Sequence, residues 1–312
     1  MRRTVAVLTG LVVVAVAAAC GGGDRERPHA APAPSPSGAP SPSGAPSPSG
    51  AVERPAAGNH RLSLPHDGAE RGYLLHAPPG YDPARPTALV VALHFYPGTG
   101  AGIRETTGLD AVADRENFLV AYPDGQNGGF NALICCGSAD DVGFLEALTG
   151  HLVRTWRADP DRIYLTGISN GGDMSFRAAV ELDETFAAIG VVSGGYSGPR
   201  TAPDDYVPDH PVSVITFIGG QDRYAEVFTS GIRTWQRRLG CRPATGAPPA
   251  GAAGVTRTDA RCADGSDVTV YTLPNMGHSW PGAPAGQLAA PDAGLVATEL
   301  IWDFFAAHPR RT

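Results

Sequence analysis

The chain has 312 residues, of which 42% are hydrophobic and 18% charged, and this is the composition of a globular protein. Its formal net charge of −7 and its lack of any lysine exclude an obvious nucleic-acid-binding surface. The length allows one large domain or two small ones.

The N-terminus has the features of an export signal. Arg2 and Arg3 precede an apolar stretch, residues 5–19, that is too short to cross a bilayer comfortably. Small residues then lead into Cys20, and this pattern resembles a bacterial lipoprotein processing site. We therefore expect residues 1–19 to be a signal peptide and Cys20 to carry lipid. A plain secretory signal or a membrane anchor are the alternatives.

The next segment, residues 20–59, is rich in Pro, Ser, Gly and Ala and repeats Ser-Pro-Ser-Gly-Ala-Pro from Ser35. It has too few apolar side chains to offset the entropy of ordering it, so we expect an extended tether. With lipid on Cys20, the tether would hold a folded body, residues 60–312, outside the cytoplasmic membrane. This predicts an extracellular or cell-envelope location.

Within that body, apolar runs alternate with segments of helical periodicity. The predicted strands are residues 88–94, 118–123, 162–167, 186–194, 212–220 and 268–274. Several are continuous runs of apolar residues, as a sheet covered on both faces requires. Apolar side chains at helical spacing predict helices over residues 142–156, before Gly240 and near the C-terminus. The pattern predicts one α/β domain, with a mostly parallel sheet and helices on both faces.

Ser169 lies in the pattern Gly167-x-Ser169-x-Gly171, directly after a predicted strand and before a predicted helix. The motif alone is weak, because a glycine-rich chain contains such patterns by chance. Its context is more specific, since a serine on a tight strand-to-helix turn is exposed at the carboxyl edge of a sheet. The helix N-terminus also favours developing negative charge. We therefore predict that Ser169 is a nucleophile.

A serine hydroxyl needs a base and a carboxylate, which follow it in the order Ser, Asp or Glu, His in hydrolases of this architecture. Asp222 follows the strand predicted at residues 212–220, and His278 follows the strand predicted at residues 268–274. A helix N-cap and an ordinary loop histidine are the alternatives. The chain order of Asp222 and His278, and their positions after strands, favour a triad of Ser169, His278 and Asp222.

An oxyanion hole needs two backbone N–H donors. Asn170, the residue after Ser169, supplies the first, and the turn "HFYPGTG" after the strand at residues 88–94 supplies the second. Phe95 occupies the position where lipases and esterases have glycine. The second donor is therefore Tyr96 by alignment, or Phe95 otherwise.

The cysteines fit an exported protein. Without Cys20 they number four, which is consistent with disulfides in an oxidising compartment. Cys241 and Cys262 are expected to form a disulfide that closes a Pro/Gly/Ala-rich excursion. Cys135 and Cys136 then remain as a vicinal bridge or as free thiols. No spacing suggests a metal site, and we expect no cofactor.

Several segments together resemble one family, the secreted polyhydroxybutyrate depolymerases and feruloyl or acetylxylan esterases. They are "YLLHAPPGYDPARPTALVVALH", "FLVAYPDG", "ICCGSADDVGFL", "DPDRIYLTGISNGGDM", "FAAIGVVSGG" and "MGHSWPG". The resemblance implies an α/β-hydrolase fold with Ser169 as nucleophile, His278 as base and Asp222 as the acid that orients it. The departures from the family pattern are Phe95 in the oxyanion turn and "IGGQDRYAEV" around Asp222.

The sequence thus predicts an exported serine esterase that cleaves short-chain acyl, hydroxyacyl or hydroxycinnamoyl esters. The alternatives are an acyltransferase acting on cell-envelope glycans or lipids, and a non-catalytic binding lipoprotein with the same fold. The expected partners are an ester substrate and, through the lipid alone, a membrane, with no nucleic acid. Trp280 and Tyr96 are candidates to line the mouth of the site and stack on a ring, or else ordinary packing residues.

Overall fold

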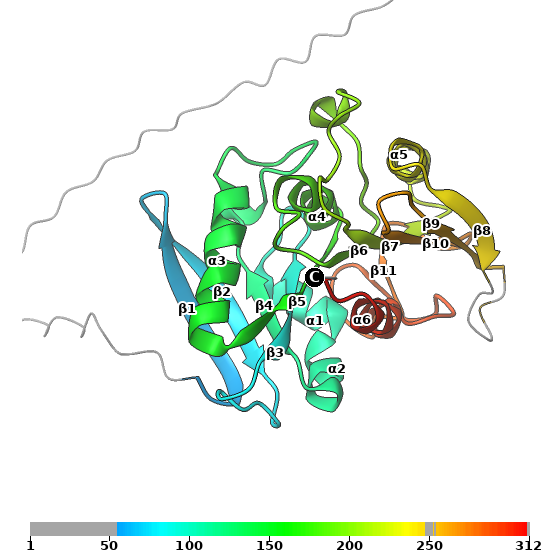
Figure 1. The fold of residues 1–312 in the computed structure, drawn as a ribbon. Coiled ribbons are helices and arrows are strands. Elements are labelled where there is room, and N and C mark those ends of the chain that lie inside the picture. Colours follow the sequence, from blue (N-terminus) through cyan, green and yellow to red (C-terminus); the bar gives the residue numbers. More distant parts are fainter. Residues whose placement is uncertain (1–54, 247–251, 253, 311–312) are drawn as a thin grey trace, which may run out of the picture. The chain divides into compact units, whose positions relative to one another are not determined.

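A ten-stranded sheet forms the centre of the described part of the chain, residues 55–246, 252 and 254–310 of a computed structural model (Figure 1). These residues belong to one compact unit, Val52–Thr312. The predicted signal peptide, Cys20 and most of the predicted tether lie outside the described residues. The first strand begins at Gly58, two residues before the boundary predicted for the folded body.

The strands of the sheet are β1 (Gly58–His66), β2 (Ala69–Ala77), β3 (Thr87–Leu93), β4 (Leu119–Pro123), β5 (Ala158–Ile168), β6 (Ala188–Val192), β7 (Ser213–Gly219), β8 (Arg242–Gly246), β9 (Thr256–Arg261) and β10 (Asp267–Leu273). Their order across the sheet is β1-β2-β4-β3-β5-β6-β7-β10-β9-β8. The pairs from β4 to β10 are parallel, and those at both edges are antiparallel. The described residues also form a separate pair of short strands, β11 (Trp280–Pro281) and β12 (Ala289–Ala290).

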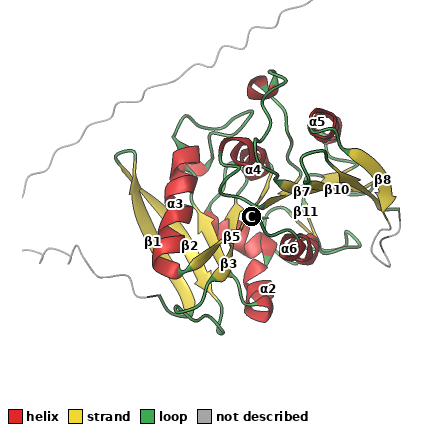
Figure 2. Ribbon diagram, in the orientation of Figure 1, coloured by secondary structure: helices red, strands yellow, loops and turns green. Residues whose placement is uncertain are grey.

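Helices cover both faces of the sheet (Figure 2). The α-helices are α1 (Gly100–Thr107), α2 (Leu109–Glu116), α3 (Asp141–Trp156), α4 (Asn170–Glu181), α5 (Ala225–Arg238) and α6 (Ala297–Ala307), and the 3-10 turns are η1 (Gln126–Gly128) and η2 (Pro199–Thr201). Side chains of α3, α4 and α5 belong to the core on one face. Those of α1, α2 and α6 belong to the core on the other. This layered arrangement confirms the predicted fold class.

Burial explains which strands are visible in the sequence. Every residue of β3, β4, β6 and β7 is buried, so these strands are continuous apolar runs. The edge strand β1 alternates between half-buried and exposed positions instead. Among the described helices, none combines the length and the apolar character needed to cross a membrane.

The predicted excursion between Cys241 and Cys262 contains an edge hairpin. Strands β8 and β9 pair antiparallel, and Arg242 lies opposite Arg261. Cys241 and Cys262 form a disulfide at the open end of this hairpin. Residues 247–251 and 253, within the excursion, lie outside the described residues.

Candidate active site

Ser169 stands between the last residue of β5 and the first residue of α4, with φ 56° and ψ −121°. A positive φ is uncommon for a residue with a side chain, and it marks a sharp turn. The flanking glycines are required by close packing. A Cβ at Gly167 would come within 2.5 Å of the Gly171 backbone, and one at Gly171 within 2.3 Å of the Leu93 carbonyl oxygen. The turn therefore holds the serine on a rigid and tightly packed strand-to-helix junction.

Asp222 and His278 are in direct contact. His278 Nδ1 lies 2.6 Å from Asp222 Oδ2, and the side chain of the aspartate is fully buried. The second carboxylate oxygen, Oδ1, accepts a hydrogen bond from the Tyr224 N–H at 2.9 Å. The histidine side chain remains 26% exposed. Its Nδ1 is committed to the aspartate, so its Nε2 is the nitrogen available to a reacting group.

The loops that carry these two residues are tied together by their backbones. The Gln221 N–H donates to the Met276 carbonyl at 2.9 Å, and the Gly220 N–H donates to the Leu273 carbonyl at 2.8 Å. A Cβ at Gly219 would lie 2.3 Å from the Gly277 carbonyl oxygen, so the loops meet where only glycine fits. The position of His278 relative to Asp222 is therefore fixed by main-chain contacts.

All three residues follow parallel strands, β5, β7 and β10, so they lie at one edge of the sheet. Residues at the carboxyl ends of neighbouring parallel strands form the usual ligand site of an α/β sheet. Among the described residues, no hydrogen bond joins the Ser169 hydroxyl to His278. In enzymes without substrate, this contact is often loose.

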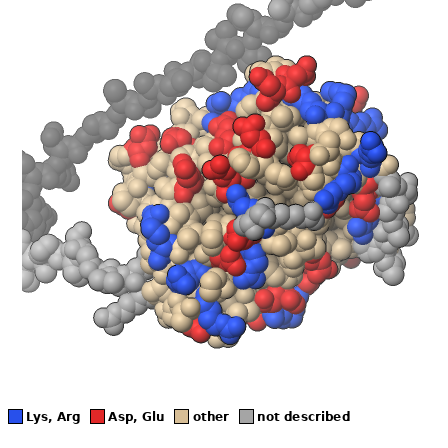
Figure 3. Space-filling view, in the orientation of Figure 1, with Lys and Arg blue, Asp and Glu red and all other residues tan. Residues whose placement is uncertain are grey.

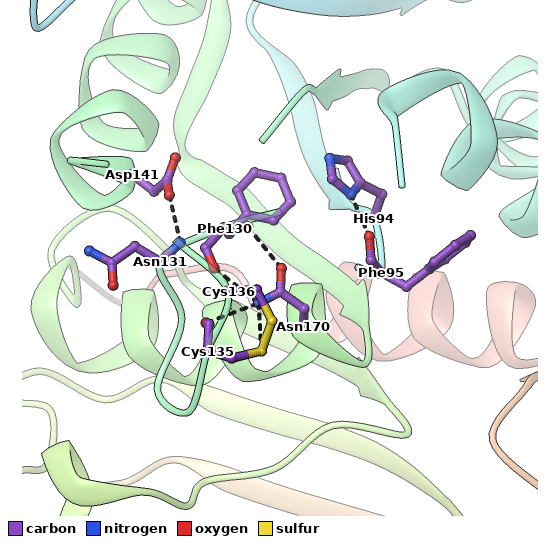
Figure 4. Close-up of a disulfide and its surroundings, with 8 residues drawn as sticks. All are labelled: His94, Phe95, Phe130, Asn131, Cys135, Cys136, Asp141 and Asn170. Atoms are coloured by element: carbon purple, nitrogen blue, oxygen red, sulfur yellow. Dashed lines mark hydrogen bonds between the residues drawn. A yellow bond between two sulfur atoms is a disulfide. The ribbon is translucent and has the colours of Figure 1, made fainter. Parts of the chain in front are cut away.

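Asn170 begins α4, so its backbone N–H has no partner within its own helix. Its side chain is 3% exposed and holds the loop that contains the vicinal cysteines (Figure 4). Oδ1 accepts the Phe130 N–H at 2.8 Å, while Nδ2 donates to the Phe130 carbonyl at 3.0 Å and to the Cys135 carbonyl at 3.2 Å. Cys135 and Cys136 form a vicinal disulfide, which is one of the two states that the sequence left open.

His94 orients the turn that carries the second predicted oxyanion donor. Its Nε2 accepts the Gly125 N–H at 2.9 Å, so Nδ1 carries the proton and donates to the Phe95 carbonyl at 2.7 Å. Burial lowers the pKa of His94 and keeps its ring neutral. In a trans peptide, the C=O and the N–H point in opposite directions. The Tyr96 N–H is therefore directed away from His94, which favours Tyr96 over Phe95 as a donor.

The prediction that Trp280 lines the mouth of the site is wrong. Its side chain is fully buried, and its Nε1 donates to Thr298 Oγ1 at 2.9 Å in the core beneath α6. Tyr96, the other candidate, is 51% exposed. The aromatic side chains nearest to His278 are Tyr224 and Phe228, with ring centroids at 5.9 Å and 6.3 Å.

Asp173 is a buried acid that the sequence did not single out. It lies one helical turn after Ser169, is 7% exposed and accepts the Gly195 N–H at 2.8 Å. Burial raises the pKa of Asp173 to about 7. Its only sequence signal is a carboxylate in the first turn of the helix that follows Ser169.

Two further features lie away from this site. A cavity lined by Asp183, His210 and Arg310 is at the amino-terminal ends of β6 and β7, the opposite edge of the sheet from Ser169. Acidic and basic side chains are interspersed on the face drawn in Figure 3, with no field of one sign. Among the described residues, no group of three or more His, Cys, Asp or Glu side chains is placed to hold a metal ion.

Comparison with known proteins agrees with the fold and the family. The model of the family described as "Esterase PHB depolymerase" matches residues 71–202. The chain is 30% identical to "Putative esterase NocK" of Nocardia uniformis subsp. tsuyamanensis over 94% of this chain and 96% of that protein. It is also 30% identical to "Feruloyl esterase C" of Emericella nidulans over 76% of this chain and 84% of that protein.

Solved structures share the fold at low sequence identity. An acetyl xylan esterase from Aspergillus awamori aligns with TM-score 0.54 and 18% identity, over 80% of this chain and all of that one. The structure titled "Crystal Structure of pOPH Native" aligns with TM-score 0.57 and 17% identity, over 83% and 90% of the two chains. The predicted α/β-hydrolase fold is confirmed, and the chain belongs to the PHB depolymerase family of carboxylic ester hydrolases.

Proposed function

We propose that this chain is an exported serine esterase that works through a Ser169, His278, Asp222 triad. The observation that carries the proposal is the 2.6 Å contact from His278 Nδ1 to Asp222 Oδ2. It occurs at the same edge of the sheet as a serine held at positive φ on a strand-to-helix turn. A buried carboxylate on Nδ1 fixes the imidazole tautomer and stabilises the imidazolium that forms when Nε2 takes a proton.

The reaction proceeds in two similar halves. A bond forms from Ser169 Oγ to the ester carbonyl carbon as the serine proton moves to His278 Nε2, and the carbonyl oxygen becomes an oxyanion. The backbone N–H groups of Asn170 and Tyr96 stabilise that charge. The ester C–O bond then breaks, and the proton on Nε2 passes to the leaving alcohol. Water repeats the sequence on the acyl-enzyme, releasing the acid and restoring Ser169.

The substrates that we propose are short-chain acyl, hydroxyacyl or hydroxycinnamoyl esters. The family description and the name of the Emericella relative point to hydroxyacyl and feruloyl esters. The half-exposed ring of Tyr96, in the turn that carries an oxyanion donor, gives such a group a surface to contact. No metal or organic cofactor takes part in this scheme.

We further propose that the chain is exported and anchored by lipid on Cys20, with residues 1–19 removed and residues 20–59 as the tether. The support is the order of features before Cys20: two arginines come first, an apolar stretch follows, and small residues lead into the cysteine. Membrane-fraction protein should have an N-terminal peptide whose mass includes a lipid on Cys20. A free amino terminus downstream of Cys20 would contradict the anchor.

The triad is tested by Ser169→Ala and His278→Ala. Each should lower kcat for 4-nitrophenyl butyrate about 10⁵-fold without changing the urea unfolding midpoint, because the triad acts as a unit. Ser230→Ala, an exposed serine on α5, is the matched control and should keep its activity. A folded Ser169→Ala or His278→Ala protein with near wild-type kcat would refute the triad.

A further inference from the structure

The described part of the chain exposes five large apolar side chains. Among the described residues they are Tyr96, Ile134, Tyr224, Val227 and Val296. A single exposed apolar residue needs no explanation, but several at one site indicate a binding surface. Tyr96 and Ile134 belong to the turns on the oxyanion side, while Tyr224 lies against His278.

On the oxyanion side, we name Tyr96 and the loop of Ile134, Cys135 and Cys136 the acyl face. The Tyr96 ring packs on Gly129. A Cβ added at Gly129 would lie 2.6 Å from Tyr96 Cδ2 and 3.3 Å from Cys136 Cβ. Tyr96 and Ile134 are each 51% exposed. Tyr96 and Cys136 are therefore neighbours at Gly129, Ile134 precedes Cys135 in the same loop, and both Tyr96 and Ile134 are open to a ligand.

The acyl face is attached rigidly to the nucleophile turn. Asn170 donates to the Cys135 carbonyl at 3.2 Å and pairs with the Phe130 backbone through two further hydrogen bonds (Figure 4). The backbone of Asn170 also supplies a proposed oxyanion donor. One buried side chain thus links the acyl face to the point where the scissile carbonyl must lie.

The reaction itself decides which half of the ester meets the acyl face. His278 returns its proton to the leaving alcohol, so the alcohol lies on the His278 side, beside Tyr224 and Phe228. The carbonyl oxygen points to the backbone donors of Asn170 and Tyr96. The remaining substituent of the carbonyl carbon is the acyl group, which extends away from His278 over the turns that carry those donors.

We propose that the acyl face binds an apolar acyl group larger than acetyl, aromatic groups included. This inference rests on the proposed function. The Tyr96 ring offers an edge or face to an aromatic acid, and the disulfide sulfurs are polarisable partners for such a ring. Ile134 adds an aliphatic contact. The specificity of the enzyme for the acid half of the ester is thereby assigned to Tyr96, Ile134 and the vicinal disulfide.

The test uses two variants and esters that share one leaving group. For the full-length enzyme, kcat/KM is measured with 4-nitrophenyl acetate, butyrate and cinnamate. In Ile134→Ala, the butyrate-to-acetate and cinnamate-to-acetate ratios of kcat/KM should fall about tenfold. The bound acyl group would lose the apolar surface that it covers on the Ile134 side chain. Tyr96→Leu should reduce the cinnamate ratio most. Val296→Ala removes a side chain that is 45% exposed at the N-cap of α6, outside the acyl face, and should leave both ratios within twofold of wild type.

A second series keeps acetate as the acid and changes the alcohol from 4-nitrophenol to 2-naphthol. The ratio of these two acetates should be unchanged in Ile134→Ala. If folded Ile134→Ala and Tyr96→Leu change the acyl ratios no more than Val296→Ala does, or change the alcohol ratio instead, the acyl face is wrong while the esterase proposal stands. If wild-type protein cleaves no ester, or cleaves esters without Ser169, both proposals fail.

Discussion

The Asn170 side chain pairs with the Phe130 backbone in both directions: its Oδ1 accepts the Phe130 N–H at 2.8 Å and its Nδ2 donates to the Phe130 carbonyl at 3.0 Å. These bonds join the residue after Ser169 to the loop that carries the vicinal disulfide. Both residues are buried, so the Phe130 N–H depends on Asn170 Oδ1 for its hydrogen bond, while the Phe130 carbonyl also accepts the Ala132 N–H at 2.8 Å.

Asn170→Ala should therefore lose stability and turnover together. The Phe130 N–H would lose its partner, while the Phe130 carbonyl would keep the bond from the Ala132 N–H, so the free energy of unfolding should fall by about 2 kcal/mol. Asn170→Ala would also misplace an oxyanion donor, so kcat should fall about 10-fold to 100-fold, and KM should rise by a smaller factor. Urea denaturation and steady-state kinetics measure the two effects. Asn131→Ala, which removes one bond to the Ala139 carbonyl, is the comparison and should affect kcat far less.

His94 should act on turnover through its two hydrogen bonds. His94→Ala frees the Phe95 carbonyl and the Gly125 N–H, so the Tyr96 N–H is no longer held in one direction. We expect kcat to fall about 100-fold with a smaller change in KM. The exposed His210 provides the control, and His210→Ala should be within twofold of wild type. Equal activity of folded His94→Ala and wild type would contradict this role.

Asp173 should make the protein less stable as the pH rises through neutrality. Burial raises its pKa from an ordinary value of 3.8 to about 7, so the folded state binds a proton that the unfolded state releases above about pH 4. The stabilisation is complete below pH 4 and is lost as the pH rises through about 7. Asp173→Asn should retain the hydrogen bond from Gly195 and increase the free energy of unfolding at pH 8 by about 2 kcal/mol.

Urea unfolding at pH 5 and pH 8 measures this dependence. Wild-type protein should lose stability between the two, and Asp173→Asn should lose less. Asp205→Asn, at an exposed position in the loop after η2, should follow the wild-type curve. Parallel curves for wild type and Asp173→Asn would show that Asp173 is ionised in the folded protein.

The Cys241–Cys262 disulfide should contribute stability but not catalysis. It closes the excursion that contains β8 and β9 at one edge of the sheet. Replacing both cysteines by serine should lower the free energy of unfolding by about 3 kcal/mol, because the unfolded chain gains freedom. Initial rates on 4-nitrophenyl butyrate at 25 °C should stay within twofold. A large loss of kcat in a folded double variant would place this hairpin closer to the chemistry.

The central strands could be predicted from sequence because burial on both faces leaves a strong local signal. The runs at residues 88–94 and 212–220 correspond to β3 (Thr87–Leu93) and β7 (Ser213–Gly219). The edge strand β1 and the next-to-edge strand β9 alternate and carry polar or charged residues, so their sequences do not stand out from loops. β1 pairs with the next strand, β2, across the turn at Asp67 and Gly68, and β9 pairs with β10 and with β8, so these strands are held by pairing and not by a buried apolar run.

The candidate site divides in the same way. Ser169, Asp222 and His278 each follow a recognisable strand, so chain order and strand ends were sufficient to nominate them. The prediction for Trp280 is wrong because closeness to His278 in sequence does not show which way the Trp280 side chain points. Its hydrogen bond to Thr298 depends on the position of α6, which is distant in sequence. The role of His94 was missed because the Gly125 N–H that fixes its tautomer belongs to a different loop.

The central claim is that Ser169 is the nucleophile, and covalent labelling tests it most directly. A fluorophosphonate should add one phosphonyl group per molecule, with the modified peptide containing Ser169, and hydrolysis of 4-nitrophenyl butyrate should disappear in proportion to labelling. Peptide mass spectrometry and residual activity are measured on the same samples. An adduct on another residue with Ser169 unmodified, or full activity in protein completely labelled at Ser169, would contradict the account.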